Sequence, residues 1–245
     1  PVMSVKRSQS GARILTALEK IGEHQPIGLS ELARILDEDK SAVMRAIMTL
    51  ADGGWIRAAP DKPTRWELTG HIHSIAKYAC DGHHDLRRHA HSALEALRDR
   101  TGESVLLNVP ENGKFIVIDV FESPSVLRSA PPIGMIVSSR GSATSRAILP
   151  FMPLAEQMAF LGGPPDRAQL EDFAATVVRG YVISQGDVVA GSTNIAAPLF
   201  DKDSRAIAAV LISAPNNRAT VEDYERLGGL GAETARHLSR GPAPK

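Results

Sequence analysis

Residues 40–49 carry side chains whose chemistry suits contact with nucleic acid. Lys40 and Arg45 are cations, Ser41 and Thr49 are hydroxyl donors, and Met44 is a long, flexible apolar side chain. They remain on one face of a predicted helix once its apolar residues are assigned to the core, namely Val43, Ala46, Ile47 and Leu50. Such a face can contact phosphates and base edges. The alternative is a solvated helix surface, the usual place of exposed Lys and Arg.

A shorter predicted helix precedes this one and is separated from it by a tight turn. Ser30 is its expected N-cap, and its apolar face comprises Leu32, Ile35 and Leu36. The polar residues 37–40 interrupt that pattern, after which Asp39 or Ser41 can cap the second helix. Two short helices joined by a turn do not by themselves distinguish a DNA-binding motif from a plain helical hairpin.

The flanking segments favour the DNA-binding motif. Gly53 and Gly54 end the second helix, and residues 55–57 and 65–68 are apolar pieces around a Pro- and Asp-bearing turn, which predicts a β-hairpin. Upstream, residues 11–21 form a first helix, followed by a turn at Pro26 and Gly28. The expected core-facing residues of that helix are Ile14, Leu15, Leu18 and Ile21. This order is that of a winged helix-turn-helix, whose second helix can enter a DNA major groove.

The charge balance is a weak point of this interpretation. The chain has 28 Lys and Arg against 28 Asp and Glu, and residues 3–68 hold ten of the former against nine of the latter. One excess charge supplies little electrostatic attraction to DNA, so the cations must be concentrated on one face, although a symmetric dimer doubles the phosphate contacts. A winged helix used only for protein contacts therefore remains a third hypothesis.

Length and composition bound the class of protein. A chain of 245 residues with 43% hydrophobic and 23% charged residues is an ordinary globular protein of one or two domains. No apolar run approaches the roughly 18 residues that span a bilayer, and residues 1–10 lack the apolar core of a signal peptide, so we expect no membrane association and a cytoplasmic location. The single Cys80 excludes an internal disulfide framework and a cysteine-built zinc site.

Two consecutive helices are expected after the hairpin, at residues 69–80 and 85–100, with a break at Asp81 and Gly82. The apolar stripe of the first comprises Ile72, Ile75, Ala76 and Ala79. It either pairs with its twin in a dimer or packs back onto its own domain. The predicted organisation is a DNA-binding domain at residues 1–68, a linker helix at 69–82, and a larger domain at 83–245.

Six histidines cluster between residues 71 and 91. They are His71, His73, His83, His84, His89 and His91. The pairs two residues apart point to different faces of a helix, which is poor geometry for chelation, and no cysteines complete a zinc set. We therefore expect surface histidines and no metal site.

The larger domain is predicted to be α+β with a mainly antiparallel sheet. Residues 103–122 form a hairpin around Asn112 and Gly113, and its second run is apolar on both faces, which indicates a sheet covered on both sides. Residues 127–137 form a further extended piece interrupted by Pro131 and Pro132. Three later strands are expected at 181–184, 194–200 and 207–213. A helix ends at Gly180, and Thr220 opens a final helix with Asp223 at the capping-box distance.

A small, polar loop at residues 138–145 leads into a short helix at 146–149, which Pro150 ends. Hydroxyl groups and free backbone N–H groups there suit a carboxylate or phosphate ligand, and an ordinary surface turn is the alternative. Arg140 or Arg146 can pair with a ligand carboxylate, although a solvated arginine is the commoner case for each.

Catalytic and cofactor motifs are missing from the sequence. It has no nucleophile elbow, P-loop, HExxH motif or dinucleotide-binding glycine run, so we expect no enzyme and no cofactor. A hydrolase or transferase in residues 83–245 that uses Ser139 and Ser142 is the competing hypothesis, and it lacks a base placed by the sequence.

These segments in this order resemble the IclR-type bacterial transcriptional regulators over nearly the whole chain. In the first domain the resemblance rests on Leu29–Ala33, Lys40–Val43 with Arg45, and Leu50 followed by Gly54–Ile56. In the second it rests on Thr101–Val105, Arg146–Leu149, Arg179–Val182 and Ile195–Phe200.

The resemblance implies a winged helix-turn-helix, a linker helix and a GAF-like effector domain. It implies a homodimer or dimer of dimers that binds an inverted-repeat operator in double-stranded DNA and answers to a small organic or aromatic acid. The resulting DNA-binding prediction comprises Ser30, Lys40, Ser41, Ala42, Met44, Arg45 and Arg65. The effector prediction comprises Gly141, Ser142, Ala143, Ser184, Asn194 and Ser213.

The sequence departs from the family pattern at three places. Ser145-Arg146-Ala147 stands where the family usually has Gly-Lys-Ala, and Arg140 stands near the place of a common histidine. The usual acidic residue after the Gly-Tyr strand is Asp187. These departures concern the identity of the effector and not the fold.

Overall fold

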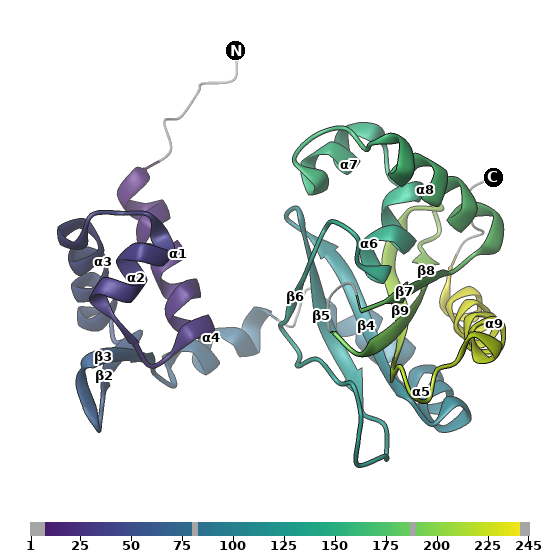
Figure 1. The fold of residues 1–245 in the computed structure, drawn as a ribbon, viewed down its shortest axis with the longest axis horizontal. Coiled ribbons are helices and arrows are strands. Elements are labelled where there is room, and N and C mark those ends of the chain that lie inside the picture. Colours follow the sequence, from purple (N-terminus) through teal and green to yellow (C-terminus); the bar gives the residue numbers. More distant parts are fainter. Residues whose placement is uncertain (1–7, 80–82, 187–189, 241–245) are drawn as a thin grey trace. The chain divides into compact units, whose positions relative to one another are not determined.

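The computed structural model describes residues 8–79, 83–186 and 190–240 (Figure 1). The chain divides into two compact units, residues 1–81 and 82–245. None of the helices in the described ranges is long and apolar enough to cross a membrane.

The first unit contains three packed helices and a small sheet. The helices are α1 (Gln9–His24), α2 (Leu29–Leu36) and α3 (Lys40–Asp52), and the strands are β1 (Ile27–Gly28), β2 (Ile56–Ala59) and β3 (Lys62–Leu68). The strand order is β1-β3-β2, all antiparallel, and Trp66 lies opposite Ile27 on one side and Ala58 on the other. A further helix, α4 (His71–Ala79), follows the wing. The expected winged helix-turn-helix order is confirmed.

Three local predictions in this unit are wrong. The turn expected at Pro26 and Gly28 includes the strand β1, which pairs with the wing. Because that pairing keeps the chain extended to Gly28, α2 begins at Leu29 with Gly28 as its N-cap, and Ser30 is an exposed first-turn residue that does not cap the helix. In α1, Leu15 is 64% exposed, whereas Ala17 is fully buried.

The second unit is built on one antiparallel sheet of six strands in the order β6-β5-β4-β9-β8-β7. The strands are β4 (Ser104–Glu111), β5 (Lys114–Phe121), β6 (Ile136–Val137), β7 (Val182–Gln185), β8 (Ser192–Phe200) and β9 (Ala206–Pro215). Asn112 and Gly113 both have positive φ, 49° and 76°, as a type I′ turn requires, so the predicted hairpin is confirmed. Only Ile136–Val137 of the extended piece expected at 127–137 is a strand.

Helices cover both faces of this sheet (Figure 1). One face packs against α5 (His84–Thr101) and α9 (Val221–Leu238), and the other against α6 (Ala143–Ile148) and α8 (Arg167–Arg179). Strand β4 shows how the two cores arise, because alternate residues point to opposite faces. Val105 and Leu107 join the α5/α9 core, whereas Leu106 joins the α6/α8 core. The α+β class and the doubly covered sheet are confirmed.

The ends of several helices follow their sequence signals, and one segment does not. Gly102 and Gly180 adopt the left-handed conformation after α5 and α8. The Asp223 carboxylate accepts the backbone N–H of Thr220 at 3.2 Å at the start of α9. The short helix expected at 146–149 begins instead at Ala143, and Pro150 lies inside a single 3₁₀ turn, Leu149–Phe151. Helix α7 (Leu154–Leu161) was not anticipated.

Candidate nucleic-acid interface and ligand pocket

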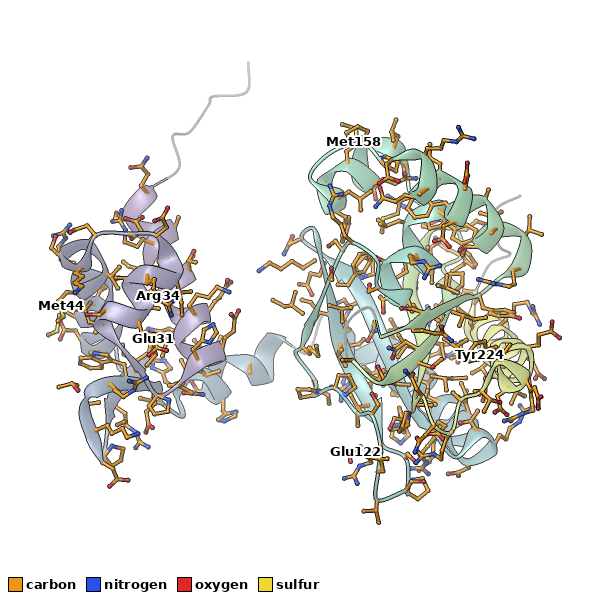
Figure 2. All side chains as sticks on the ribbon, in the orientation of Figure 1. Glu31, Arg34, Met44, Glu122, Met158 and Tyr224 are labelled. Atoms are coloured by element: carbon orange, nitrogen blue, oxygen red, sulfur yellow. The ribbon has the colours of Figure 1, made fainter. Side chains whose placement is uncertain are left out.

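Helix α3 exposes most of the side chains predicted to contact DNA. Lys40, Ser41 and Arg45 are exposed, and Met44 is 38% exposed on the outer side of the helix (Figure 2). Ala42 is only 8% exposed, so its side chain belongs to the buried side of the helix and cannot offer its methyl group to a base. Met48, which is 47% exposed one turn after Met44, extends the same surface and was not predicted.

Asp39 fixes the start of α3. Its carboxylate accepts the backbone N–H groups of Ser41 at 3.0 Å and Ala42 at 3.4 Å, and it also accepts the Ser41 hydroxyl. These hydrogen bonds, that of the Ser41 hydroxyl first, lower the pKa of Asp39 below its ordinary value. The capping prediction is confirmed for Asp39, and Ser41 contributes its hydroxyl to the cap rather than acting as the cap itself.

The wing arginines are held within the first unit. Arg65 donates to the carbonyl of Pro26 at 2.7 Å and to the Glu31 carboxylate at 2.7 Å. Arg57 pairs with Glu67 across the hairpin at 2.8 Å. Arg65 therefore joins the wing to α2, and a DNA contact would have to use the part of its guanidinium that remains exposed. Lys62, an exposed residue at the start of β3, was missed in the sequence because a lone lysine next to a proline carries no motif.

In this near-neutral unit some of the basic side chains form ion pairs and others do not. Acidic side chains neutralise Arg13, Lys20, Arg57 and Arg65. Within the described residues, Lys40 and Arg45 have no such ion pair, and the nearest polar contact of Arg45 is 3.5 Å to the Ser41 hydroxyl. Arg34 of α2 and Lys62 of the wing are also exposed without an ion pair in the described residues, so the unpaired cations include two on α3 and one on each of its neighbours. Cations gathered in this way are what a small net charge requires of a DNA-binding surface.

A small, partly open pocket lies between the sheet of the second unit and α6. Its cavity volume is about 30 Å³, enough for only one or two water molecules. The pocket is lined by Leu106, Asn108, Val117, Pro131, Met135, Val137, Ser142, Ala143, Thr144, Asn194 and Leu211. None of these side chains is charged, so hydrogen bonds and apolar contacts are the interactions that it offers.

Three of the six predicted effector residues meet at this pocket. Ser142 and Ala143 enter from the start of α6, and Asn194 enters from β8. Ser142 is the N-cap of α6: its hydroxyl donates to the Ser138 carbonyl at 2.7 Å and accepts the Ser145 backbone N–H at 3.1 Å. Gly141 does not line this pocket and is exposed with φ at 81°.

Ser184 and Ser213 lie beside Asn194 without lining the pocket. Ser184 is opposite Asn194 on β7, and Ser213 is opposite it on β9, so the three form one polar row across the sheet. Ser104 continues the row on β4. The Ser213 hydroxyl is within 2.8 Å of that of Ser129, so this residue also holds the segment between β5 and β6.

Two polar residues of the pocket, Asn108 and Thr144, were not predicted. Asn108 is 1% exposed and its amide nitrogen donates to the Thr144 hydroxyl at 2.6 Å. Its amide oxygen is buried without a hydrogen-bond partner. A polar residue between Leu107 and Val109 in a buried strand was the available signal, because it interrupts an apolar run of the sheet.

The two arginines considered as partners for a ligand carboxylate have other roles. Arg146 forms a bidentate pair with Asp172 of α8 and donates to the carbonyl of Ile183 at 3.1 Å. Arg140 donates to the carbonyl of Leu161 at 2.5 Å. Neither lines the pocket. The expectation of a solvated arginine holds for Arg140, which is exposed, and is wrong for Arg146, which is half-buried and tied to α8 and β7. Asp187 lies outside the described residues.

The two serines that the competing enzyme hypothesis uses, Ser139 and Ser142, direct their hydroxyl groups to backbone carbonyls. Ser139 is 3.5 Å from the carbonyl of Gly113, and Ser142 is occupied as described above. Among the described histidines, His71 stacks on Trp55 with ring centroids 4.4 Å apart, and His89 contacts the carbonyl of Leu238. In the same ranges no three His, Cys, Asp or Glu side chains are placed to hold a metal ion.

The three-helix unit with its wing and the separate α+β unit with its pocket define the class of DNA-binding regulators with a sensing domain. Residues 11–60 match the IclR helix-turn-helix domain, and residues 79–240 match the bacterial transcriptional regulator IclR C-terminal domain. The chain belongs to the IclR family of bacterial transcriptional regulators, which confirms the resemblance. This family consists of transcriptional regulators and not of enzymes, so the competing enzyme hypothesis is wrong.

Relatives align along nearly the full chain. The HTH-type transcriptional regulator BhcR of Paracoccus denitrificans is 26% identical over 246 residues, which covers 95% of this chain and 87% of the relative. The transcriptional repressor IclR of Escherichia coli is 24% identical, with 94% and 89% covered. An IclR family regulator from Brucella abortus has the same fold, with a TM-score of 0.78, 20% identity and coverage of 95% and 92%.

Proposed function

We propose that this regulator binds an inverted-repeat operator through α3 and that a small organic acid bound in the second unit controls that binding. The observation that carries the DNA part is the pair of exposed cations on α3, Lys40 and Arg45, for which the described residues provide no ion pair. Lys40, Ser41, Met44 and Arg45 contact the operator, with Met48 and Lys62 as added candidates. Ser30 and Arg65 contribute from the first turn of α2 and from the wing.

The operator is read by a homodimer, in which two copies of α3 enter successive major grooves about one helical turn apart. Exposed apolar side chains of the first unit support this assembly, because Leu15 of α1 is 64% exposed and Ile75 of α4 is 45% exposed. His71 joins the start of α4 to Trp55, so a change in the linker helix reaches the base of the wing. Dimers of dimers are the larger assembly.

The effector occupies the pocket beside α6, where Thr144 and Asn194 supply neutral donors. Asn194 uses one amide hydrogen on the Ser192 hydroxyl at 3.1 Å and has a second to offer. A cavity of about 30 Å³ cannot accept an organic acid without moving its walls. The effector therefore favours a wider arrangement, in which Pro131 and Met135 of the segment between β5 and β6 are displaced, and this preference is what controls the operator-bound state.

Operator binding by the full-length protein tests the proposal. Fluorescence anisotropy with promoter fragments should give an affinity that falls steeply with added salt, because phosphate contacts release counterions. Candidate organic acids should then change that affinity. Failure to bind any promoter fragment at low salt, with or without the acids, would contradict the proposal, and salt-insensitive association would favour a protein-contact role for the wing.

A further inference from the structure

The Asn108–Thr144 pair is buried inside the second unit with only part of its hydrogen-bonding capacity used. Both residues are at most 1% exposed, and their one mutual hydrogen bond, of 2.6 Å, is the only bond that either side chain makes among the described residues. The Asn108 amide oxygen has no donor, and the Thr144 hydroxyl proton has no acceptor assigned to it. A buried acceptor without a donor destabilises a fold, so it needs an explanation beyond packing.

Packing does not require polar side chains at these places. On the same face of the sheet, the neighbours of Asn108 are apolar: Leu106 precedes it on β4, Val117 lies opposite on β5, and Ala209 lies opposite on β9. An aliphatic residue would continue this surface without leaving a polar atom unpaired. The pair opens into the pocket instead, which points to a group that is supplied from outside the chain.

The two polar ends of the pocket are separated by an apolar floor. From Asn108 the path runs to Leu106 on β4, to Leu211 opposite on β9, and then diagonally to Asn194 on β8, which is opposite Ser213. Two strand spacings and four residues place the backbones of Asn108 and Asn194 about 16 Å apart in a flat sheet. A ligand that reaches both ends therefore has two polar groups joined by an apolar body.

We propose that the effector carries an uncharged hydrogen-bonding group, a hydroxyl or an amide, that is received by Asn108 and Thr144 at the end of the pocket opposite Asn194. The inference rests on the proposed function and specifies its ligand as a hydroxy or amide derivative of an organic acid. A carboxylate has no proton to donate, so it cannot satisfy the Asn108 oxygen and belongs at the Asn194 end. A hydroxyl can donate to Asn108 and accept from Thr144 at the same time.

The ligand-free protein provides the first arm of the test. The double variant Asn108→Leu/Thr144→Val replaces both partners with apolar side chains, and we expect its melting temperature to rise by about 2–4 °C because a buried unpaired acceptor is removed. Asn108→Ala/Thr144→Val is a smaller second variant that cannot overfill the site. The control is Thr176→Val, a buried threonine outside the pocket whose hydroxyl is satisfied by the Asp172 carbonyl, and it should not melt higher.

Calorimetric titration with matched acids provides the second arm. The probes are 6-hydroxyhexanoate against hexanoate, and 3-(4-hydroxyphenyl)propanoate against 3-phenylpropanoate. We expect the wild type to bind one hydroxylated acid at least tenfold more tightly than its partner, because a site built for a hydroxyl discriminates strongly against its loss. The double variant should lose this preference, and Thr176→Val should keep it.

The outcomes separate the inference from the function on which it rests. Equal affinity for both members of a pair that binds, or a preference that survives in the double variant, overturns the inference and leaves acid sensing in place. If none of the four acids binds, the acid effector is contradicted, and the melting arm alone decides whether Asn108 and Thr144 are an unfilled receptor. A lower melting temperature in both double variants overturns that role.

Discussion

At the scale of single residues, partners decide which polar side chains are free to act. Arg45 and Arg65 look equivalent in the sequence, yet Arg65 is paired with Glu31, whereas no ion pair holds Arg45 within the described part of the chain. Ala42 and Met44 are separated by one residue on α3, yet the first is buried and the second exposed. The proposed DNA contacts therefore rest more heavily on Lys40, Ser41, Met44 and Arg45 than on the rest of the predicted set.

Arg45→Ala should weaken operator binding by roughly 1–3 kcal/mol if the guanidinium contacts a base edge. The loss should be accompanied by relaxed sequence preference at one operator position, measured by footprinting or by competition with mutated operators. Arg57→Ala is the matched control, since Arg57 is already paired with Glu67 in the hairpin. An Arg45 variant with unchanged affinity and preference would remove this residue from the interface.

At the scale of elements, short-range signals predicted ends and turns well, whereas packing decided the exact registers. Glycine caps, the Asn112–Gly113 turn and the Thr220–Asp223 start depend on residues within a few positions of one another, so they were accessible from the sequence. The start of α2 was not, because it depends on pairing between β1 and β3, which are separated by more than 30 residues. Likewise, Leu15 is exposed and Ala17 is buried, because the elements that pack against α1 decide which of its side chains lie in the core.

Two adjacent glycines of α9 give a prediction at this scale. A Cβ on Gly228 would lie 2.2 Å from the ring of Tyr181, whereas a Cβ on Gly229 meets nothing within 4 Å. Gly228→Ala should therefore destabilise the protein by about 1–3 kcal/mol through overpacking. Gly229→Ala should stabilise it by about 0.5–1 kcal/mol through the better helix propensity of alanine.

Chemical denaturation of the two alanine variants measures both effects with one method. Equal stability changes in the two variants would show that Tyr181 moves aside without cost, and would contradict close packing of α9 against this ring.

At the scale of the whole molecule, control is a coupling between two units that have separate cores. The first unit holds the DNA-binding surface and the second holds the pocket, so an effector acts only by favouring one arrangement of the protein over another. The small size of the pocket ties the proposed effector to such a change, because an acid bound there would have to displace the wall formed by Pro131 and Met135.

Thermodynamic linkage supplies a quantitative prediction for this coupling. If an effector changes operator affinity by a given factor, saturating operator DNA must change effector affinity by the same factor. Titrating the acid into free protein and into the protein–operator complex measures the two factors independently. Inequality of the factors would mean that the acid acts on operator binding by another route, such as a change of assembly state.

The sequence by itself determined the class of this protein, because helix periodicity, turn residues and motif order are local properties that survive without knowledge of distant contacts. It predicted the winged unit, the doubly covered antiparallel sheet, and three of the residues that line the pocket. Only the tertiary structure decided that Arg65 and Arg146 are held by carboxylates, that Ser184 and Ser213 form a row beside the pocket, and that Asn108 lies at its end. Those facts depend on which strands and helices become neighbours, and burial and charge compensation are properties of neighbours in space.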